Sequence, residues 1–397
     1  MTITRTITRT RAADWRRKAV PAAAVALLLA ACGTGGGSDS SGGGGGGGGG
    51  GSATNASCSS LTKVKLQLQW VAQSQFAGYY AAKDQGLWAK ECLDVTIVEG
   101  GVDIVPQTQL ATGAVDFAIA WVPKALASRE QGAKITDIGQ IYQRSGTLQV
   151  AFKDSGITSA ADLKGKKVGN WGFGNEFELF AGLQKAGIDP KSGVTLVQQQ
   201  FDMAALLSKQ IDAAQAMVYN EYAQVLEQKN PATGQLYQPS DLSVINWQQA
   251  GVAMLQDAIW ANTDKLKNDP AYQDTAVRML KGAISGWAYC RDSFQPCVDI
   301  VLKNGPTLGA SHQAWQLAKV NELVWPSPGG VGVIDKAAWD QTVSVATSQK
   351  VVSAAPDADA YTNTYVQKAV DALKAGGMDV TGSSYKAPDV ALKEGGK

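Results

Sequence analysis

A strand that turns directly into a helix, over residues 64–86, constrains this chain more than any other stretch. From Val64 to Trp70, apolar residues alternate with Lys and Gln, which is the pattern of a half-buried β-strand. The pattern then becomes helical, with Ser74 as the expected N-cap and Gly86 as the expected end. Units of this kind build open α/β sheets, which bind ligands at the turns that follow their strands.

The turn of this unit carries an aromatic face, two amides and a hydroxyl, and no acid–base group. They lie beside helix N-terminal N–H groups that lack partners within the helix. A Gln amide donates and accepts at once, which suits a ring with alternating N and NH2 groups. The turn therefore predicts a site for a small polar ring, with candidate contacts at Trp70, Gln73, Gln75, Phe76 and Tyr79.

The same strand–turn–helix design recurs at residues 167–187, where Trp171 follows a strand and a Gly-rich turn carries Asn175 and Glu176. Glu176 is the sole carboxylate of this turn, and the helix dipole keeps it ionised. It can accept hydrogen bonds from an amino group and a protonated ring nitrogen together, or simply stabilise the helix start. We expect the two turns to face each other across one gap and to hold the same ligand.

Three further strand ends supply candidate contacts. Gly101 lets the backbone approach a ligand closely, and Trp121 and Tyr219 each end a predicted strand. An aromatic ring stacked on a flat heterocycle contributes about 0.5–1.5 kcal/mol beyond its burial. Packing within the protein is the alternative for each aromatic residue.

The order of the predicted elements divides the body of the chain into two lobes. Residues 64–140 follow a βαβαβ pattern, and a strand at 254–260 returns to that half before helices dominate. A body of about 340 residues also exceeds the usual size of a single core. We therefore expect an α/β fold with lobe I at residues 61–149 and 250–397 and lobe II at residues 150–249.

The N-terminus has the composition of an export signal followed by a tether. Residues 1–31 hold a cationic segment and then an apolar run that is too short to span a bilayer. The run ends in Leu29-Ala-Ala-Cys32, which resembles a bacterial lipobox and implies cleavage before Cys32 and lipidation of that cysteine. Residues 32–60 are rich in Gly and Ser and predict a flexible tether.

Charge and histidine content exclude several classes of function. Removal of residues 1–31 takes six of the 36 Lys/Arg and one of the 35 Asp/Glu, which leaves a net charge of −4. No basic stripe remains, so nucleic acid is not an expected partner. The single histidine, His312, and cysteines without a paired Cys-x-x-Cys spacing argue against a metal site.

Four cysteines beyond Cys32 predict two disulfides in an exported protein. Cys58 and Cys92 each precede a predicted strand, so parallel neighbouring strands would bring them to one sheet edge. Cys290 and Cys297 are close enough in sequence to close a small loop. The first bridge would close a loop of roughly 35 residues and contribute about 3–4 kcal/mol.

Six segments of the chain match a known pattern: residues 73–80, 82–86, 100–101, 115–119, 164–169 and 174–176. Together they resemble the periplasmic solute-binding lipoproteins of ABC importers. The resemblance covers residues 64 to about 270 and favours the branch that binds the thiamine pyrimidine precursor, which is related to alkanesulfonate, taurine and nitrate binders. Cys92 stands where relatives usually have Gly, consistent with an extra disulfide.

The resemblance implies a type II periplasmic-binding-protein fold whose two lobes close on a ligand and dock onto a membrane permease. It implies hinge segments near residues 149–152 and 248–255, and a monomer lipid-anchored to the outer face of the cell membrane. Neither a cofactor nor a metal is expected. The eukaryotic pyrimidine synthases that resemble these binders need histidines and a cysteine-rich segment, so no enzymatic activity is expected here.

The expected ligand is a thiamine pyrimidine precursor held between aromatic faces and paired to Glu176. Replacement of Glu176 by Ala should then cost about 1.5–3 kcal/mol of binding. An alkanesulfonate or taurine-like anion is one alternative, although Glu176 would repel it and the turns contain no Arg. Riboflavin is another alternative, given the eleven Trp of the chain.

Overall fold

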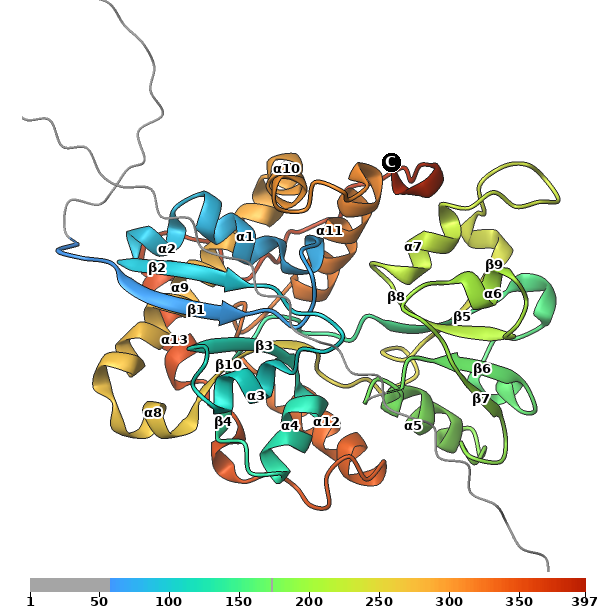
Figure 1. Ribbon diagram of the computed structural model, residues 1–397, viewed down its shortest axis with the longest axis horizontal. Coiled ribbons are helices and arrows are strands. Elements are labelled where there is room, and N and C mark those ends of the chain that lie inside the picture. Colours follow the sequence, from blue (N-terminus) through green and yellow to red (C-terminus); the bar gives the residue numbers. More distant parts are fainter. Residues whose placement is uncertain (1–57, 173) are drawn as a thin grey trace, which may run out of the picture. The chain divides into compact units, whose positions relative to one another are not determined.

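The computed structural model describes residues 58–172 and 174–397 (Figure 1). The expected export signal, Cys32 and nearly all of the expected tether lie outside the described residues. The strands are β1 Thr62–Gln67, β2 Leu93–Val98, β3 Phe117–Trp121, β4 Ile135–Gln140, β5 Thr147–Phe152, β6 Lys167–Asn170, β7 Thr195–Gln198, β8 Ala213–Met217, β9 Leu242–Asn246 and β10 Asp257–Asn262.

Helices connect and cover these strands. They are α1 Ala77–Asp84, α2 Leu87–Lys90, α3 Pro106–Ala111, α4 Val122–Glu130, α5 Phe177–Lys185, α6 Ala204–Leu207, α7 Glu221–Leu226, α8 Thr263–Asn268, α9 Pro270–Asp292, α10 Phe294–Asn304, α11 Ala310–Val324, α12 Lys336–Ser348 and α13 Thr364–Ala375. Among the helices of the described residues, none combines the length and the apolar character needed to cross a membrane.

The strands form two five-stranded sheets, ordered β2-β1-β3-β10-β4 and β7-β6-β8-β5-β9. Strand β10 runs antiparallel to β3 and β4, and β5 runs antiparallel to β8 and β9. The chain leaves the first sheet after β4 and returns to it at β10, so residues 141–146 and 247–256 connect the sheets. The expected mixed α/β fold class is confirmed.

The connections differ in part from the expected hinge segments. Residues 149–152 lie inside β5 and pair with β8 and β9, so this stretch belongs to the second sheet. Residues 248–255 do lie in the second connection. The sequence suggested that the apolar residues 148–152 cross from one lobe to the other. In the structure the chain crosses between the sheets in residues 141–146, just before β5.

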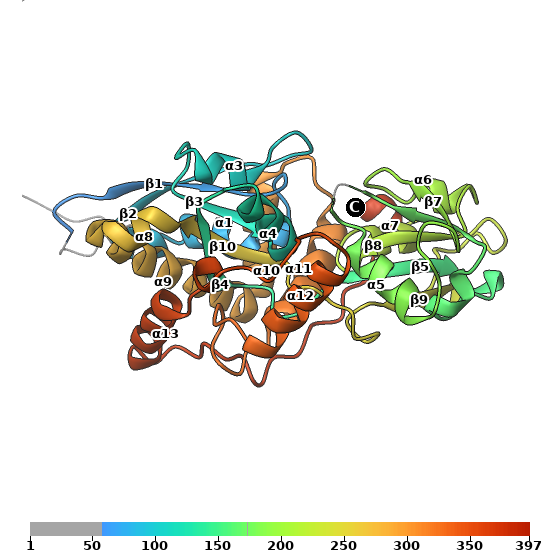
Figure 2. The same cartoon turned by 90° about the horizontal axis from the view of Figure 1, so that it is seen from below.

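Helices cover both faces of the first sheet, as the alternation of β3 shows. Phe117 and Ile119 point into one core with residues of α1, α9 and α13, whereas Ala118 and Ala120 point into another with residues of α3 and α4. Figure 2 shows α3 on one side of this sheet and α9 and α13 on the other. Small alanines on the second face let α3 and α4 approach the sheet closely.

The first strand–turn–helix unit begins its helix later than the sequence predicts. Residues Ser74–Phe76 form a 3₁₀ turn and α1 starts at Ala77. Ser74 does not cap its own helix, because its hydroxyl donates to the Gln313 carbonyl (2.8 Å) and its N–H donates to Gln313 Oε1 (2.7 Å). A partner far away in the sequence therefore replaces the expected local cap.

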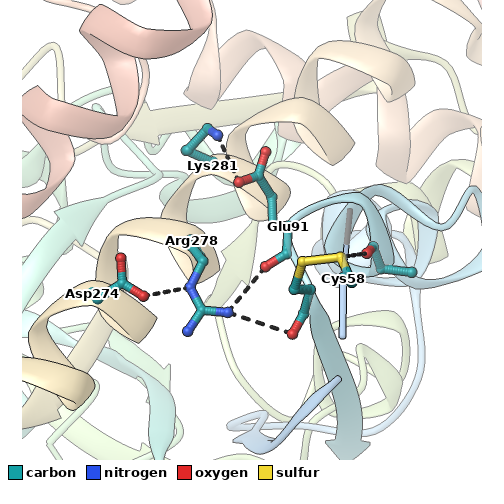
Figure 3. The surroundings of a disulfide bond; sticks show 7 residues. Cys58, Glu91, Asp274, Arg278 and Lys281 are labelled. Atoms are coloured by element: carbon teal, nitrogen blue, oxygen red, sulfur yellow. Dashed lines mark hydrogen bonds and ion pairs between the residues drawn. A yellow bond between two sulfur atoms is a disulfide. The ribbon is translucent and has the colours of Figure 1, made fainter. Parts of the chain in front are cut away.

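Both predicted disulfides are present in the structure. The Cys58–Cys92 bond joins the residues that precede the parallel neighbours β1 and β2 (Figure 3). Beside it, Arg278 of α9 donates to the carbonyls of Glu91 (3.2 Å) and Cys92 (3.4 Å), and Lys281 pairs with Glu91 (2.6 Å). The disulfide and these contacts thus hold the starts of β1 and β2 against α9.

The Cys290–Cys297 bond closes the short loop that the sequence predicts, and it joins the end of α9 to the start of α10. Pro296, which lies between the two cysteines, is in the first turn of α10. A proline is tolerated there, since the N–H it lacks would have no partner inside the helix.

Candidate functional site

A cavity of about 720 Å³ lies where the two predicted turns approach each other. From the first turn it is lined by Gln69, Trp70, Gln73 and Gln75, and from the second by Trp171, Gly174 and Asn175. This volume is in the range of sites that enclose a drug-sized ligand, about 300–1,000 Å³. The two turns therefore share one cavity, as the sequence predicts.

Most of the predicted contact residues lie on the wall of this cavity, namely Trp70, Gln73, Gln75, Gly101, Trp121, Trp171, Asn175 and Tyr219. Phe76, Tyr79 and Glu176 are not among the lining residues. Phe76 and Tyr79 lie in the core, with exposed fractions of 0% and 1%. Tyr79 packs edge-on against Trp287 of α9 (5.8 Å), because α9 covers the face of α1 that carries it.

The carboxylate of Glu176 is engaged by its own turn. Its Oε2 accepts a hydrogen bond from the N–H of Gly174 (3.0 Å). Gly174 adopts φ +85°, a left-handed conformation that favours glycine, so this turn is fixed by local geometry. This bond lies in the turn before α5, and among the described residues Glu176 makes no capping hydrogen bond to that helix, so its local role differs from the helix-start stabilisation that the sequence offered as the alternative.

A buried carboxylate organises the amides of the first turn. Asp257 is 1% exposed, and it accepts hydrogen bonds from Gln69 Nε2 and Gln75 Nε2, the latter at 2.8 Å. Burial raises the pKa of Asp257 to about 7. Sequence reasoning missed Asp257, although a lone carboxylate heading a strand as apolar as Ala258–Ala261 is a signal of a buried polar role.

The network continues away from Asp257. Gln73 Nε2 donates to Gln75 Oε1 (2.6 Å), and Gln73 Oε1 accepts from Gln316 Nε2 of α11 (3.3 Å). Gln316 also accepts from the backbone N–H of Gln75 (3.0 Å), and Tyr142 donates to the Gln75 carbonyl (2.9 Å). These bonds fix which end of each amide is the donor and which is the acceptor, which gives the cavity wall a defined polarity.

An aromatic ring of the protein lies between the two turns. Phe201 stacks on Trp171 (ring centroids 6.0 Å apart, planes 19° apart) and tilts against Trp70 (4.9 Å). Its side chain is nevertheless 38% exposed, and it lines the cavity. Phe201, which sequence reasoning did not single out, therefore completes an aromatic wall and occupies a place where a flat ligand could stack.

The single histidine lies at the joint between α7 and α11 and is not a lining residue of the cavity. Its Nδ1 contacts Glu227 Oε1 (2.7 Å) and its Nε2 contacts Asn220 Oδ1 (2.9 Å). Both ring nitrogens of His312 are thus engaged in structural hydrogen bonds. In residues 58–172 and 174–397, no group of three His, Cys, Asp or Glu side chains is arranged to hold a metal ion.

The fold of the chain is that of solved periplasmic binding proteins. The periplasmic sulfonate-binding protein SsuA from Methylobacillus flagellatus superposes with a TM-score of 0.59 at 17% identity, over 83% of this chain and 99% of that one. The periplasmic aliphatic sulphonate binding protein SsuA from Escherichia coli gives 0.57 at 15% identity, over 84% and 97%. These likenesses establish the fold class.

A profile of the family described as NMT1/THI5 like matches residues 73–293, and the chain belongs to this family. The riboflavin-binding protein RibY from Chloroflexus aurantiacus is 24% identical over 77% of this chain and 87% of its own length. The formylaminopyrimidine-binding protein from Halalkalibacterium halodurans is 22% identical over 73% and 86%.

Other relatives match over a shorter span. The 4-amino-5-hydroxymethyl-2-methylpyrimidine phosphate synthase from Legionella pneumophila is 31% identical over 36% of this chain and 45% of its own length. A protein of Haemophilus influenzae named for thiamine biosynthesis is 30% identical over 38% and 48%. The chain thus spans about half the length of these two relatives.

Proposed function

We propose that this chain is the substrate-binding component of an ABC importer and that it captures a small flat nitrogen heterocycle, in the first place a thiamine pyrimidine precursor. The observation that carries the proposal is the shared cavity, in which tryptophans and oriented amides from both turns surround one space. Aromatic faces bind a flat ring by stacking, and amides pair with its ring nitrogens and amino groups.

The relatives support this class of ligand. Of the proteins that match along most of their length, one is named for formylaminopyrimidine and one for riboflavin. Both compounds contain a flat nitrogen heterocycle. The engagement of both nitrogens of His312 favours binding over catalysis, because neither nitrogen is left to act on a ligand as an acid or base.

Riboflavin is the second candidate, and the size of the cavity favours it. A volume of about 720 Å³ leaves room for more than one small ring. The match to the riboflavin-binding relative also extends over 77% of this chain. A ligand with a fused ring system and a polar tail would use both the aromatic wall and the surrounding polar groups.

Capture would proceed by closure of the two sheets around the ligand. The two connections, residues 141–146 and 247–256, touch through Gln256, which accepts from the N–H of Gly146 (2.9 Å) and donates to Thr147 Oγ1 (2.7 Å). Such a joint can bend while its hydrogen bonds persist. A ligand favours the closed form by contacts that it makes only when both turns reach it.

Calorimetric titration with 4-amino-5-hydroxymethyl-2-methylpyrimidine, a formylaminopyrimidine, riboflavin and ethanesulfonate tests the proposal. We expect at least one heterocycle to bind, and Trp121→Leu to weaken that binding by about tenfold through loss of stacking and burial. The matched control is Tyr237→Leu, an aromatic residue that packs on Phe152 and does not line the cavity. Binding of ethanesulfonate alone would contradict the heterocycle proposal.

The membrane anchor is a separate part of the proposal. Cleavage before Cys32 and lipidation of its thiol would hold the protein at the outer face of the cell membrane, within reach of a permease. We expect Cys32→Ser to release the protein from the membrane fraction into the soluble one, with unchanged ligand affinity. Retention of the variant in membranes would exclude Cys32 as the anchor.

A further inference from the structure

Lys124 brings a positive charge to the wall of the cavity. It is the third residue of α4, which begins directly after Trp121 at the end of β3. The side chain is partly buried and lines the same cavity as the two turns. Its ammonium lies over the Trp121 ring, 5.3 Å from the ring centroid.

The carboxylates near Lys124 are committed to other partners. Glu176 and Asp257 are close enough to act on the ammonium electrostatically, but neither forms an ion pair with it. Glu176 accepts from Gly174 N–H, and Asp257 accepts from Gln69 and Gln75. Within residues 58–172 and 174–397, the ammonium has no side-chain or backbone hydrogen-bond acceptor.

This arrangement is unfavourable for a charged group in the absence of ligand. Burial lowers the pKa of Lys124 to about 8, although the charges of Glu176 and Asp257 act in the opposite direction. The partly buried ammonium has the Trp121 ring as a neighbour, but no hydrogen-bonded anion among the described residues offsets the solvation that it loses. An anionic group in the cavity would supply that partner.

A second lysine reaches the cavity from a neighbouring element. Lys350 and Val351 follow α12 and line the cavity, and Lys350 is exposed. The same loop is tied to α4, since Ser353 N–H donates to Glu130 Oε1 (2.6 Å). The helix that carries Lys124 and the loop that carries Lys350 therefore lie together, and both present a cation to the cavity.

We propose that Lys124 is the centre of a second subsite, which binds a tetrahedral oxyanion carried by the ring ligand, such as a phosphate monoester. This inference rests on the proposed function and extends it: the aromatic and amide wall holds the ring, and Lys124 holds the anionic substituent. Lys350 adds long-range attraction from its exposed position. A sulfonate shares this oxyanion chemistry, and the test below separates it from a ring phosphate.

Calorimetry at pH 7 tests the subsite with four probes: 4-amino-5-hydroxymethyl-2-methylpyrimidine, its phosphate monoester, inorganic phosphate and ethanesulfonate. We expect the ester to bind the wild-type protein about tenfold or more tightly than the neutral pyrimidine, because a charge-assisted hydrogen bond is added. In Lys124→Gln, the ratio of the affinity for the ester to the affinity for the neutral pyrimidine should fall below about threefold. The matched control is Lys134→Gln, an exposed lysine outside the cavity wall.

Each outcome separates the subsite from the proposed function. Equal binding of ester and pyrimidine, or an advantage that survives Lys124→Gln, overturns the subsite and leaves the heterocycle proposal in place. Ethanesulfonate or phosphate binding that depends on Lys124 supports an oxyanion site, and it overturns the heterocycle proposal if the pyrimidine, a formylaminopyrimidine and riboflavin all fail to bind. Absence of binding by all four probes to the folded protein overturns the subsite, and the heterocycle proposal falls with it if riboflavin and a formylaminopyrimidine also fail to bind.

The pH dependence gives a readout that a merely structural lysine would not produce. The advantage of the ester should decline from pH 7 to pH 9.5, because the Lys124 ammonium loses its proton around its lowered pKa of about 8. The charged groups around it are Glu176 and Asp257, with Asp103, Glu221 and Lys350 also on the cavity wall. Asp257 gains negative charge around its own pKa of about 7, so the decline that belongs to Lys124 is the part that is absent in Lys124→Gln. The phosphate itself stays dianionic over this range. A constant advantage across this range would contradict the role of Lys124.

Discussion

The two turns that meet at the cavity are built alike in sequence but are held in different ways. The first turn is held by distant residues: Gln75 alone contacts Asp257, Gln316 and Tyr142. In the second turn, Gly172 and Gly174 adopt left-handed conformations and Asn175 Nδ2 donates to the Gly172 carbonyl (2.7 Å). Gln215 of β8 holds the backbone of this turn, since it accepts from Trp171 N–H (3.1 Å) and donates to the Asn175 carbonyl (2.5 Å). The amide side chains of the first turn are thus held by distant residues, whereas the Asn175 side chain of the second turn is held by its own turn.

This difference has a consequence for how each turn responds to change. A buried network fails when one member is removed, because its partners stay buried without hydrogen bonds. The Asn175 side chain is also buried, but its hydrogen-bond partner among the described residues is a carbonyl of its own turn, so its removal should cost less. The four predictions below test this contrast.

The largest effect is expected for Gln75→Leu in the first turn. It leaves Asp257 Oδ2 and Gln73 Nε2 without their partners, so the free energy of unfolding should fall by about 2–4 kcal/mol. Urea denaturation measures the loss. The matched change in the second turn, Asn175→Ala, should cost about 1 kcal/mol, and equal losses in the two variants would refute the contrast.

The pH dependence of stability should reflect the carboxylate behind the first turn. Burial raises the pKa of Asp257 from 3.8 to about 7, so between these values the folded state keeps a proton that the unfolded state has lost. Stability should therefore fall, by about 1.5 kcal/mol or more, as the pH rises from 5 to 8. Buried Asp137 and Glu178, with pKa values raised to about 8 and about 7, act in the same direction.

Thermal unfolding at pH 5, 7 and 8 checks this expectation. Asp257→Asn removes one of the titrating groups, so its stability should depend less on pH than that of the wild-type protein. A midpoint that rises from pH 5 to pH 8 would contradict the proposed protonation of these buried carboxyls.

A smaller effect is expected for Gly174→Ala in the second turn. A Cβ atom would meet Phe177 at an ordinary distance of 3.5 Å, so the cost comes from the left-handed backbone, φ +85°. We expect a loss of about 1 kcal/mol in stability. Gly113→Ala, which has φ +76° and open space around it, is a matched control outside the cavity wall; a loss well above the control would reveal steric crowding rather than backbone strain.

The smallest effect is expected for Glu176→Ala on ligand affinity. Direct pairing with the ligand would make the loss about 1.5–3 kcal/mol, but the carboxylate lies on Gly174 N–H and does not line the cavity. We therefore expect a loss below about 1 kcal/mol, transmitted through the turn. Calorimetry with the heterocycle that binds most tightly to the wild-type protein distinguishes these two losses of binding free energy. A loss of about 1.5 kcal/mol or more would indicate that Glu176 contacts the ligand directly.

Local patterns predicted much of the fold. The strand Leu93–Val98 and the helix Lys336–Ser348 have the bounds that the sequence suggests, because alternation, charge and flanking glycine or aspartate define them locally. Strand β9 and helix α7 were missed, since short segments carry too few residues to display a period. Ser74 was misjudged because its partner, Gln313, is 239 positions away.

The candidate site was predictable to a similar extent. Residues at strand ends, such as Trp70 and Trp171, lie on the cavity wall because topology brings strand ends together. Tyr79 lies in the core because α9 covers its side of α1, which no local pattern reveals. Lys124 and Phe201 became visible only when the tertiary structure placed them on the cavity wall. The sequence signals that Asp257 is buried, but its partners Gln69 and Gln75 are known only from the structure.

The two disulfides bear on how the protein is prepared. Chains made in a reducing cytosol lack both bridges, so the segment before β1 is no longer tied to β2 and α10 is no longer tied to α9. Thiol reductants in a sample buffer act in the same way on bridges they can reach. Ligand affinity should therefore be measured on protein that was secreted during expression and purified without thiol reductants, so that both disulfides are intact.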